Sequence, residues 1–212
     1  MKISIIRILL ATTIALVYYL PGFSHEILSE WKVAKQSGDI QVSYRYIMVG
    51  DTLKTREMRV SFSVQAEPDS IIKLFNDANN FYKWSAGIEK CEIIQSDSAS
   101  WVMYNLYDVP WPFKQRDLIT EYKLVNSDTK TTLVMTGKPD LLPEYEDVIR
   151  MKLYEGYWSF EPLQNGLTHV EFHTISFTDP IIPRFLQDPV LQKTFIRSMN
   201  KLRSLIDRDY VE

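Results

Sequence analysis

Three side chains that can bind metals alternate along one stretch of the sequence, at His169, Glu171 and His173. If this stretch is a β-strand, alternate residues project from one face, and all three side chains share that face. His169 and His173 would then lie roughly 13 Å apart, too far to ligate one ion together. The spacing also differs from the helical His-Glu-x-x-His of zinc proteases. We predict no metal site, place the three on the solvated outer face of a sheet, and place Val170 and Phe172 on its inner face.

The other reactive groups are the adjacent pair Arg116-Asp117 and the single cysteine, Cys91. Neighbouring residues at the start of a strand point to opposite faces, so Arg116 and Asp117 each need a separate partner, and we interpret both as structural. Cys91 can form no disulfide within the chain and is interpreted as a small residue packed in a strand. No nucleophile elbow, phosphate-binding loop or dinucleotide fingerprint is present. These features predict a protein that is not an enzyme and takes no cofactor.

The first residues have the layout of a secretory signal. Lys2 and Arg7 are followed by an uncharged apolar run over residues 8–20 and then by Gly22-Phe23-Ser24, a small-x-small tripeptide. The run is short for a membrane-spanning helix. We predict a signal peptide over residues 1–24, a domain over 25–212, and export to the periplasm or the exterior. An uncleaved N-terminal membrane anchor is the alternative.

Length and composition fit one globular domain. The chain has 212 residues, of which 45% are hydrophobic and 13% aromatic, enough apolar surface for a core. Its formal net charge is −3, and no run of Lys and Arg occurs. We therefore expect a monomer that does not bind nucleic acid.

The hydrophobic pattern changes from helical to strand-like along the chain. We predict a short helix over 26–36, strands over 40–48 and 53–64 joined by a turn at Gly50, a helix opening at Glu67-Pro68-Asp69, and a short helix over 80–84. Six further strands are predicted over 90–96, 101–107, 117–126, 131–136, 148–160 and 168–177. Because the turns between these strands are short, the sheet is antiparallel.

The chain ends in a predicted amphipathic helix. Asp188 fits an N-cap with Pro189 at the first helical position. Apolar residues then recur at three- and four-residue spacing on one face: Leu191, Phe195, Met199, Leu202 and Ile206. Such a helix has only the sheet to bury it. The predicted class is therefore α+β, a curved antiparallel sheet wrapped around a long C-terminal helix.

The region from about Trp31 to Ile206 resembles the START domain, the lipid-transfer fold of the helix-grip superfamily. Three stretches carry the resemblance: Trp-Pro-Phe-Lys-Gln-Arg-Asp-Leu-Ile at 111–119, Gly-Tyr-Trp-Ser-Phe-Glu-Pro-Leu at 156–163 with Gly-Leu-Thr-His-Val at 166–170, and Asp-Pro with Ile-Pro at 179–183. The resemblance implies reversible binding of a lipid or another hydrophobic small molecule in an internal apolar cavity between the sheet and the C-terminal helix.

The same resemblance suggests which side chains meet the ligand. The expected lining residues are Met103, Asn105, Tyr107, Tyr122, Phe172, Phe195, Met199 and Leu202. Trp111 and Phe113 are expected to gate the cavity or to make transient membrane contact. Sterol-binding members of the family often carry an acid and an arginine in the cavity. Met103 and Tyr122 stand at those places here, which implies a more uniformly apolar ligand.

Two alternatives remain at this point. One is an enzyme of the polyketide cyclase/aromatase branch of the superfamily, which would use polar groups such as Asn105, Tyr107, Tyr122 and Thr174. Export disfavours this reading, because carrier-bound substrates are cytoplasmic. The other is a scaffold whose core is filled and which binds no ligand.

Overall fold

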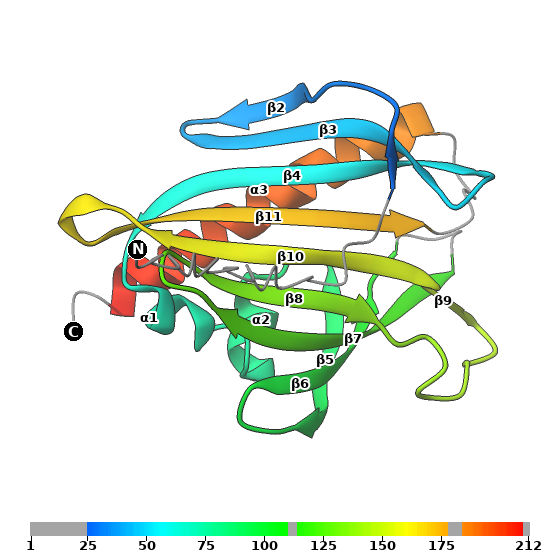
Figure 1. Cartoon of the computed structure of the whole chain (residues 1–212). Helices are drawn as coiled ribbons and strands as arrows, with labels where there is room; N and C mark the ends of the chain where they lie inside the picture. The colour runs from blue at the N-terminus through cyan, green and yellow to red at the C-terminus, as the bar shows by residue number, and fades with distance from the viewer. Residues whose placement is uncertain (1–24, 110–113, 178–183, 210–212) are drawn as a thin grey trace, which may run out of the picture.

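The computed structural model of the chain describes residues 25–109, 114–177 and 184–209. Within these residues one sheet of eleven strands curves around a long helix (Figure 1). The strands are β1 (Glu26–Ile27), β2 (Lys32–Ser37), β3 (Ile40–Val49), β4 (Leu53–Gln65), β5 (Ile88–Ser96), β6 (Ser100–Tyr107), β7 (Gln115–Asn126), β8 (Thr131–Gly137), β9 (Val148–Arg150), β10 (Leu153–Pro162) and β11 (Leu167–Phe177). The helices are α1 (Pro68–Ile72), α2 (Ala78–Trp84) and α3 (Arg184–Asp209), with a 3₁₀ turn, η1, at Gln164–Gly166.

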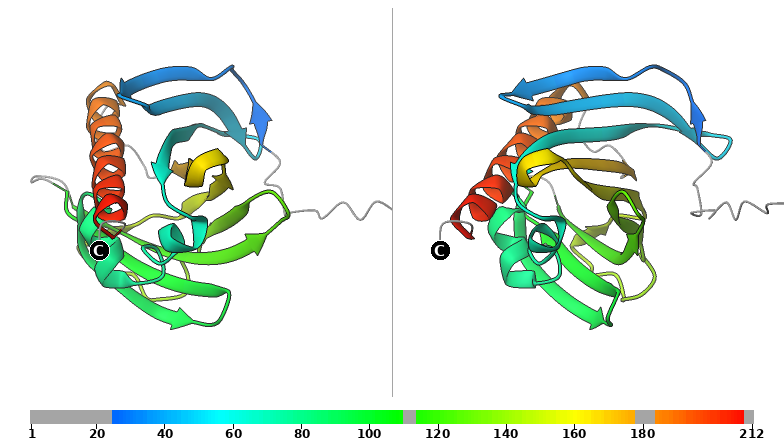
Figure 2. Two further views of the ribbon diagram at one scale, coloured as in Figure 1. Left: turned by 90° about the vertical axis from the view of Figure 1, so that its left-hand side faces the viewer. Right: turned by 60° about the vertical axis from the view of Figure 1, so that its left-hand side comes forward.

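The strand order places the last strand of the sheet beside an early one. It runs β1-β3-β4-β11-β10-β8-β7-β6-β5, with β2 also on β3 and β9 on β7. The last strand, β11, therefore lies between β4 and β10, and all the pairings are antiparallel except β7 with β9. Helix α3 crosses the concave face, and α1 and α2 lie beside its C-terminal end (Figure 2). The predicted α+β class and the antiparallel sheet around the C-terminal helix are confirmed.

Local chemistry accounts for several element boundaries. Gly50 has a positive φ of 58° in the turn between β3 and β4, a conformation that glycine adopts at little cost. Pro68 occupies the first turn of α1, where its missing N–H costs nothing. The carboxylate of Asp77 caps α2 by accepting a hydrogen bond from the backbone N–H of Asn79 over 2.8 Å.

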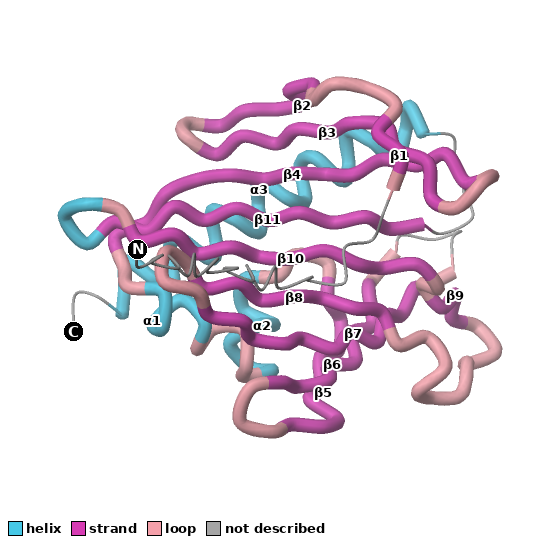
Figure 3. Tube along the Cα trace, viewed as in Figure 1, coloured by secondary structure: helices cyan, strands magenta, loops and turns pink. Residues whose placement is uncertain are grey.

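The helix predicted over residues 26–36 is wrong. The segment forms β1 and β2, both paired with β3 (Figure 3). In that pairing Lys32 lies opposite Tyr44 and Ser37 opposite Ile40. The edge of β3 offers a row of free backbone groups, and pairing with it outweighs the weak helical preference of a segment with little apolar surface.

Two other predicted boundaries differ. The strand predicted over 148–160 is two strands, because β9 pairs in parallel with β7 before the chain turns into β10. Helix α3 begins at Arg184, so that Pro189 lies inside the helix. The carboxylate of Asp188 therefore does not cap the helix. It accepts two hydrogen bonds from the guanidinium nitrogens of Arg56 on β4, over 2.6 and 2.5 Å.

The core lies between the concave face of the sheet and the three helices. From α3 it receives Ile196, Met199, Leu202 and Ile206, which are all buried. Lys193, Arg197 and Lys201 lie on the exposed side of the same helix, as its amphipathic pattern predicts. Leu191, which the pattern assigned to the apolar face, is 44% exposed.

Candidate ligand-binding site

Most of the predicted lining residues meet in one apolar cluster beneath α3. Met103, Tyr122, Phe172, Met199 and Leu202 are buried members of this cluster, and the half-buried Phe195 and Tyr107 pack against it. The sheet and the helix are in direct aromatic contact, since the ring of Phe172 lies 5.9 Å from that of Phe195. The predictions that Val170 and Phe172 face inward and that Met103 and Tyr122 face the interior are therefore confirmed.

Aromatic rings that the sequence did not single out extend this surface. Trp158 stacks on Phe172 with the ring centroids 4.4 Å apart, and Trp101 stacks on Tyr122 at 5.4 Å. Trp158 lies opposite Phe172 in the pairing of β10 with β11. The period-two pattern of 153–162 could have placed Trp158 on the inner face. It could not have shown that Trp158 lies opposite Phe172, because that depends on the strand pairing.

Three buried polar side chains without a hydrogen-bond partner in the described part of the chain interrupt the apolar surface: Asn105, Thr120 and Thr174. Asn105 and Thr120 are 0% exposed, and neither side chain has a hydrogen-bond partner among the described residues. Both face inward, because their strand neighbours Tyr104 and Ile119 pack in a separate small cluster on the outer face. A buried polar group without a partner costs about 1–3 kcal/mol. Asn105 was predicted as a site residue. Thr120 was not, although it lies two residues before Tyr122 on the same face.

Three tyrosines lie around these groups: Tyr122, which is buried, and Tyr107 and Tyr154, which are partly buried. Burial raises the pKa of Tyr107 and of Tyr122, and raises that of Tyr154 to about 12. All three hydroxyls therefore stay protonated near neutral pH and act as uncharged hydrogen-bonding groups. Tyr154, on β10, was not predicted as a site residue.

The adjacent pair Arg116-Asp117 divides between the two faces of the sheet, as predicted. On the outer face, Asp117 forms a buried bidentate ion pair with Arg150 at 2.7 and 3.0 Å. Arg150 also donates to the carbonyls of Pro139, Leu142 and Pro143, which fixes the loop between β8 and β9. The structural role of Asp117 is confirmed.

Arg116 lies on the inner face with its neighbours Leu118 and Thr120. Its side chain is half-buried, and its Nε is buried without a hydrogen-bond partner among the described residues. Burial lowers the pKa of Arg116. Arg116 forms no ion pair with any described acid. The prediction that Arg116 has a structural role is therefore not supported by a charged partner.

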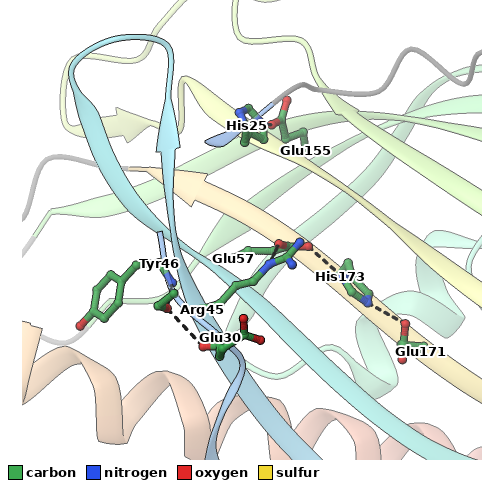
Figure 4. A network of polar contacts seen from close by, with 9 residues as sticks. His25, Glu30, Arg45, Tyr46, Glu57, Glu155, Glu171 and His173 are labelled. Atoms are coloured by element: carbon green, nitrogen blue, oxygen red, sulfur yellow. Dashed lines mark hydrogen bonds and ion pairs between the residues drawn. The ribbon is translucent and has the colours of Figure 1, made fainter. Parts of the chain in front are cut away.

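The outer face of β11 carries the row His169, Glu171 and His173, but His173 is not solvated there. Its side chain is 10% exposed and lies between the carboxylates of Glu57 and Glu171, at 2.9 and 2.6 Å (Figure 4). The expectation of a solvated face is wrong for His173, because the rings of Trp31 and Tyr157 cover the imidazole at centroid distances of 5.6 and 4.5 Å.

Other sequence predictions concern reactive groups and the membrane. Among the described residues, no group of three or more His, Cys, Asp or Glu side chains is arranged to hold a metal ion. Burial raises the pKa of the Cys91 thiol to about 12, so the thiol is protonated and a poor nucleophile. No helix in the described part of the chain is long and apolar enough to span a membrane. Trp111 and Phe113 lie outside the described residues, and their gating role stays a prediction.

The chain is similar in structure to START-related lipid transfer proteins. A STAR-related lipid transfer protein from Xanthomonas axonopodis superposes with a TM-score of 0.74 and 23% identity, over 84% of this chain and 99% of that one. Human StAR-related lipid transfer protein 5 gives a TM-score of 0.71 at 16% identity, over 86% and 89% of the two chains. An aromatase/cyclase from a Streptomyces species gives 0.53 at 14% identity, over 72% and 94%.

Sequence comparison alone is less informative. A Pseudomonas aeruginosa protein described only as uncharacterized is 23% identical over 183 residues, which span 86% of this chain and 89% of that protein. No family model matches the chain. From the structural similarities, the protein has the START, or helix-grip, fold, as the sequence resemblance implied.

Proposed function

We propose that the protein binds a lipid or another hydrophobic small molecule between the concave face of the sheet and α3, without catalysing a reaction. The observation that carries this proposal is the pair of buried, unpartnered side chains Asn105 and Thr120 inside an apolar surface. In a core built for stability alone, the amide of Asn105 and the hydroxyl of Thr120 would have hydrogen-bond partners, because each buried polar group without a partner costs about 1–3 kcal/mol. A ligand or ordered water that bonds to them removes this cost.

The fold supports the same proposal. Its structural neighbours include proteins described as lipid transfer proteins. The inner surface is aromatic and aliphatic with few polar groups, which is the usual composition of a site for small hydrophobic molecules. Because the described core is closely packed, a ligand can enter only if an element moves. Helix α3 and the segment that contains Trp111 and Phe113 are the proposed moving parts.

The proposal is tested by identifying what the purified protein carries. Native mass spectrometry after mild purification is expected to show a bound small molecule, and extraction identifies it. Met199→Trp should fill space under α3 and weaken binding of that molecule by about 1–3 kcal/mol. Lys201→Trp, on the exposed side of the same helix, is the matched control. Normal binding by a folded Met199→Trp protein would show that Met199 does not face the ligand.

A cyclase or aromatase activity is the second candidate. The buried polar groups Asn105, Thr120 and Tyr107 could steer a reactive chain, and an aromatase/cyclase has a related fold. The nearer similarity is to lipid transfer proteins, and the inner-face tyrosines have raised pKa values that make them poor bases near neutral pH. We therefore favour binding without chemistry.

A further inference from the structure

We propose that Arg116, Asn105 and Thr120 form a head-group subsite that takes the anionic oxygen atoms, carboxylate or phosphate, of an amphiphile whose tail lies under α3. This inference rests on the proposed function and names the class of ligand. The proposed ligand differs from the uniformly apolar ligand that Met103 and Tyr122 implied, because other side chains of the same face would bind its head group.

The strand register places the three side chains next to one another on the inner face of β6 and β7. Asn105 of β6 lies opposite Leu118 of β7, and Arg116 and Thr120 are the inward-facing residues on either side of Leu118. Each of them is therefore a diagonal neighbour of Asn105, at about 7–8 Å between backbone positions. A carboxylate or phosphate group that contacts Asn105 can reach one of these neighbours at the same time.

Arg116 is the charged residue of these three. The other arginine on the inner face, Arg56, is already neutralised by the bidentate contact with Asp188. Arg116 has no ion pair with any described acid, and its Nε is buried without a partner. Arginine stays charged in proteins, so a half-buried guanidinium favours an oxyanion that can accept its forked donors.

The surroundings favour an anion and not a cation. The inward-facing residues of β6 and β7 include no aspartate or glutamate: Trp101, Met103, Asn105, Tyr107, Arg116, Leu118, Thr120, Tyr122 and Leu124. The amide group of Asn105 and the hydroxyl of Thr120 supply further donors for oxygen atoms. Arg116 is the second residue of β7 and is only half-buried, which leaves the head group near water while Met103 and Tyr122 meet the tail.

The experiment measures binding of dodecanoate, dodecyl phosphate, dodecanol and dodecyltrimethylammonium by calorimetry below their micelle concentrations. These probes share one alkyl chain and differ in the head group. We expect at least one anion to bind about tenfold more tightly than dodecanol, the gain from one charge-assisted hydrogen bond, and the cation to bind most weakly. The two anions separate a carboxylate from a phosphate ligand.

Arg116→Gln should weaken binding of the preferred anion about tenfold and leave dodecanol binding unchanged. Asn105→Leu should weaken the anion and the alcohol together, since its amide serves either head group. Lys123→Gln, which removes one positive charge from the exposed, outer side of the same strand, should change neither. Circular dichroism and the melting temperature of each variant confirm that it is folded.

Two outcomes overturn the inference in different ways. If dodecanol binds as tightly as both anions, or if Arg116→Gln weakens all probes equally, the head-group subsite is wrong and apolar binding stands. If no probe binds and native mass spectrometry also finds no ligand, the proposed function fails together with the subsite.

Discussion

Asn105 and His173 are both buried polar residues, but only one of them is paired. His173 has a carboxylate on each ring nitrogen and an aromatic ring over it, an arrangement that satisfies its polar atoms and stabilises the fold. Asn105 has no partner for either polar atom of its amide among the described residues. At the scale of the single residue, satisfied polar groups therefore indicate a structural role, and unsatisfied groups on the concave face mark the proposed binding site.

The His173 network predicts a pH-dependent stability. Burial by itself lowers the pKa of His173, but hydrogen bonds to Glu171 and Glu57 outweigh burial and raise it above the usual 6.5. The stabilisation is thus complete below pH 6.5 and is lost as the pH rises through the folded-state pKa. The neighbouring charges that face the ring are Glu57 and Arg59 on β4, Glu171 on β11 and Arg45 on β3.

At low pH the change of stability with pH has the opposite sign. Burial tends to raise the pKa of Glu57, but hydrogen bonds from His173 and Arg45 lower it overall, and His173 lowers that of Glu171. Their contribution is lost as the pH falls below the usual 4.5. Urea unfolding should therefore show His173→Gln to cost about 1–3 kcal/mol between pH 4.5 and 6.5 and less as the pH rises through the folded-state pKa of His173. His169→Gln is the matched control. A cost for His173→Gln that does not change with pH would contradict this prediction.

Gly156 is a second position at which one residue decides the packing. Its φ is 157°, and a Cβ atom added there would overlap the backbone carbonyl of His173 on β11. We expect Gly156→Ala to destabilise the fold by more than about 3 kcal/mol, because two central strands must separate. Gly38→Ala has open space around the new Cβ and should cost only the left-handed strain, about 1–2 kcal/mol. Thermal melts compare the two variants, and equal losses would refute the steric explanation.

At the scale of the element, α3 is held by an apolar face and by one polar tether. The tether joins Asp188 to Arg56 of β4, and both side chains are largely buried, at 26% and 13% exposed. It forms near the N-terminal end of α3, whereas Met199 and Leu202 secure the middle of the helix. An element that must move to admit a ligand would be released at the tether before it is released at the apolar face.

Breaking the tether should therefore speed ligand exchange. In Asp188→Asn, Arg56 loses its counter-ion, and we expect a loss of about 1–3 kcal/mol with faster hydrogen exchange in the first turns of α3. Release of a bound fluorescent lipid should accelerate, while Asp207→Asn, an exposed acid of the same helix, leaves it unchanged. An unchanged release rate in Asp188→Asn, despite lost stability, would place the moving element elsewhere.

At the scale of the whole molecule, the N-terminal part of the described chain is packed on the sheet. His25 contacts Glu155 of β10, the hydroxyl of Ser29 accepts a hydrogen bond from the backbone N–H of Tyr46, and Trp31 receives the guanidinium groups of Arg45 and Arg59 on its ring. Figure 4 shows His25 beside Glu155, and Arg45 and Glu57 beside His173. His25, Ser29 and Trp31 thus pack against the strands that follow them in the described part of the chain.

Cleavage of a signal peptide after Ser24 stays a prediction. Cleavage after Ser24 would remove Lys2 and Arg7, changing the formal charge from −3 to −5, and would leave every contact described above intact. N-terminal sequencing of the protein from the periplasm or the medium is expected to begin at His25. Full-length protein in the soluble cytoplasm would contradict export, and full-length protein in the membrane fraction would favour the anchor.

Local sequence patterns predicted most of the helices and strands and the inward and outward faces of the strands. Period-two alternation assigned Phe172 inward and His173 outward, and the helical spacing assigned Met199 and Leu202 to the buried side of the last helix. These patterns are local, since each depends only on neighbouring residues and on the geometry of a strand or helix. The resemblance to START domains added the arrangement of these elements and the residues expected at the site.

Which side chains contact one another became known only from the folded chain. It showed that residues 26–37 pair with the edge of β3, that Trp31 covers His173, and that Asp117 is paired while Arg116 is not. Each of these outcomes depends on contacts between segments far apart in the chain, which a local pattern cannot specify. A repeating pattern fixes the face on which a side chain lies, but whether a polar side chain on that face finds a partner depends on strand register and packing. For this reason Arg116 and Thr120 could be proposed as site residues only from the folded chain.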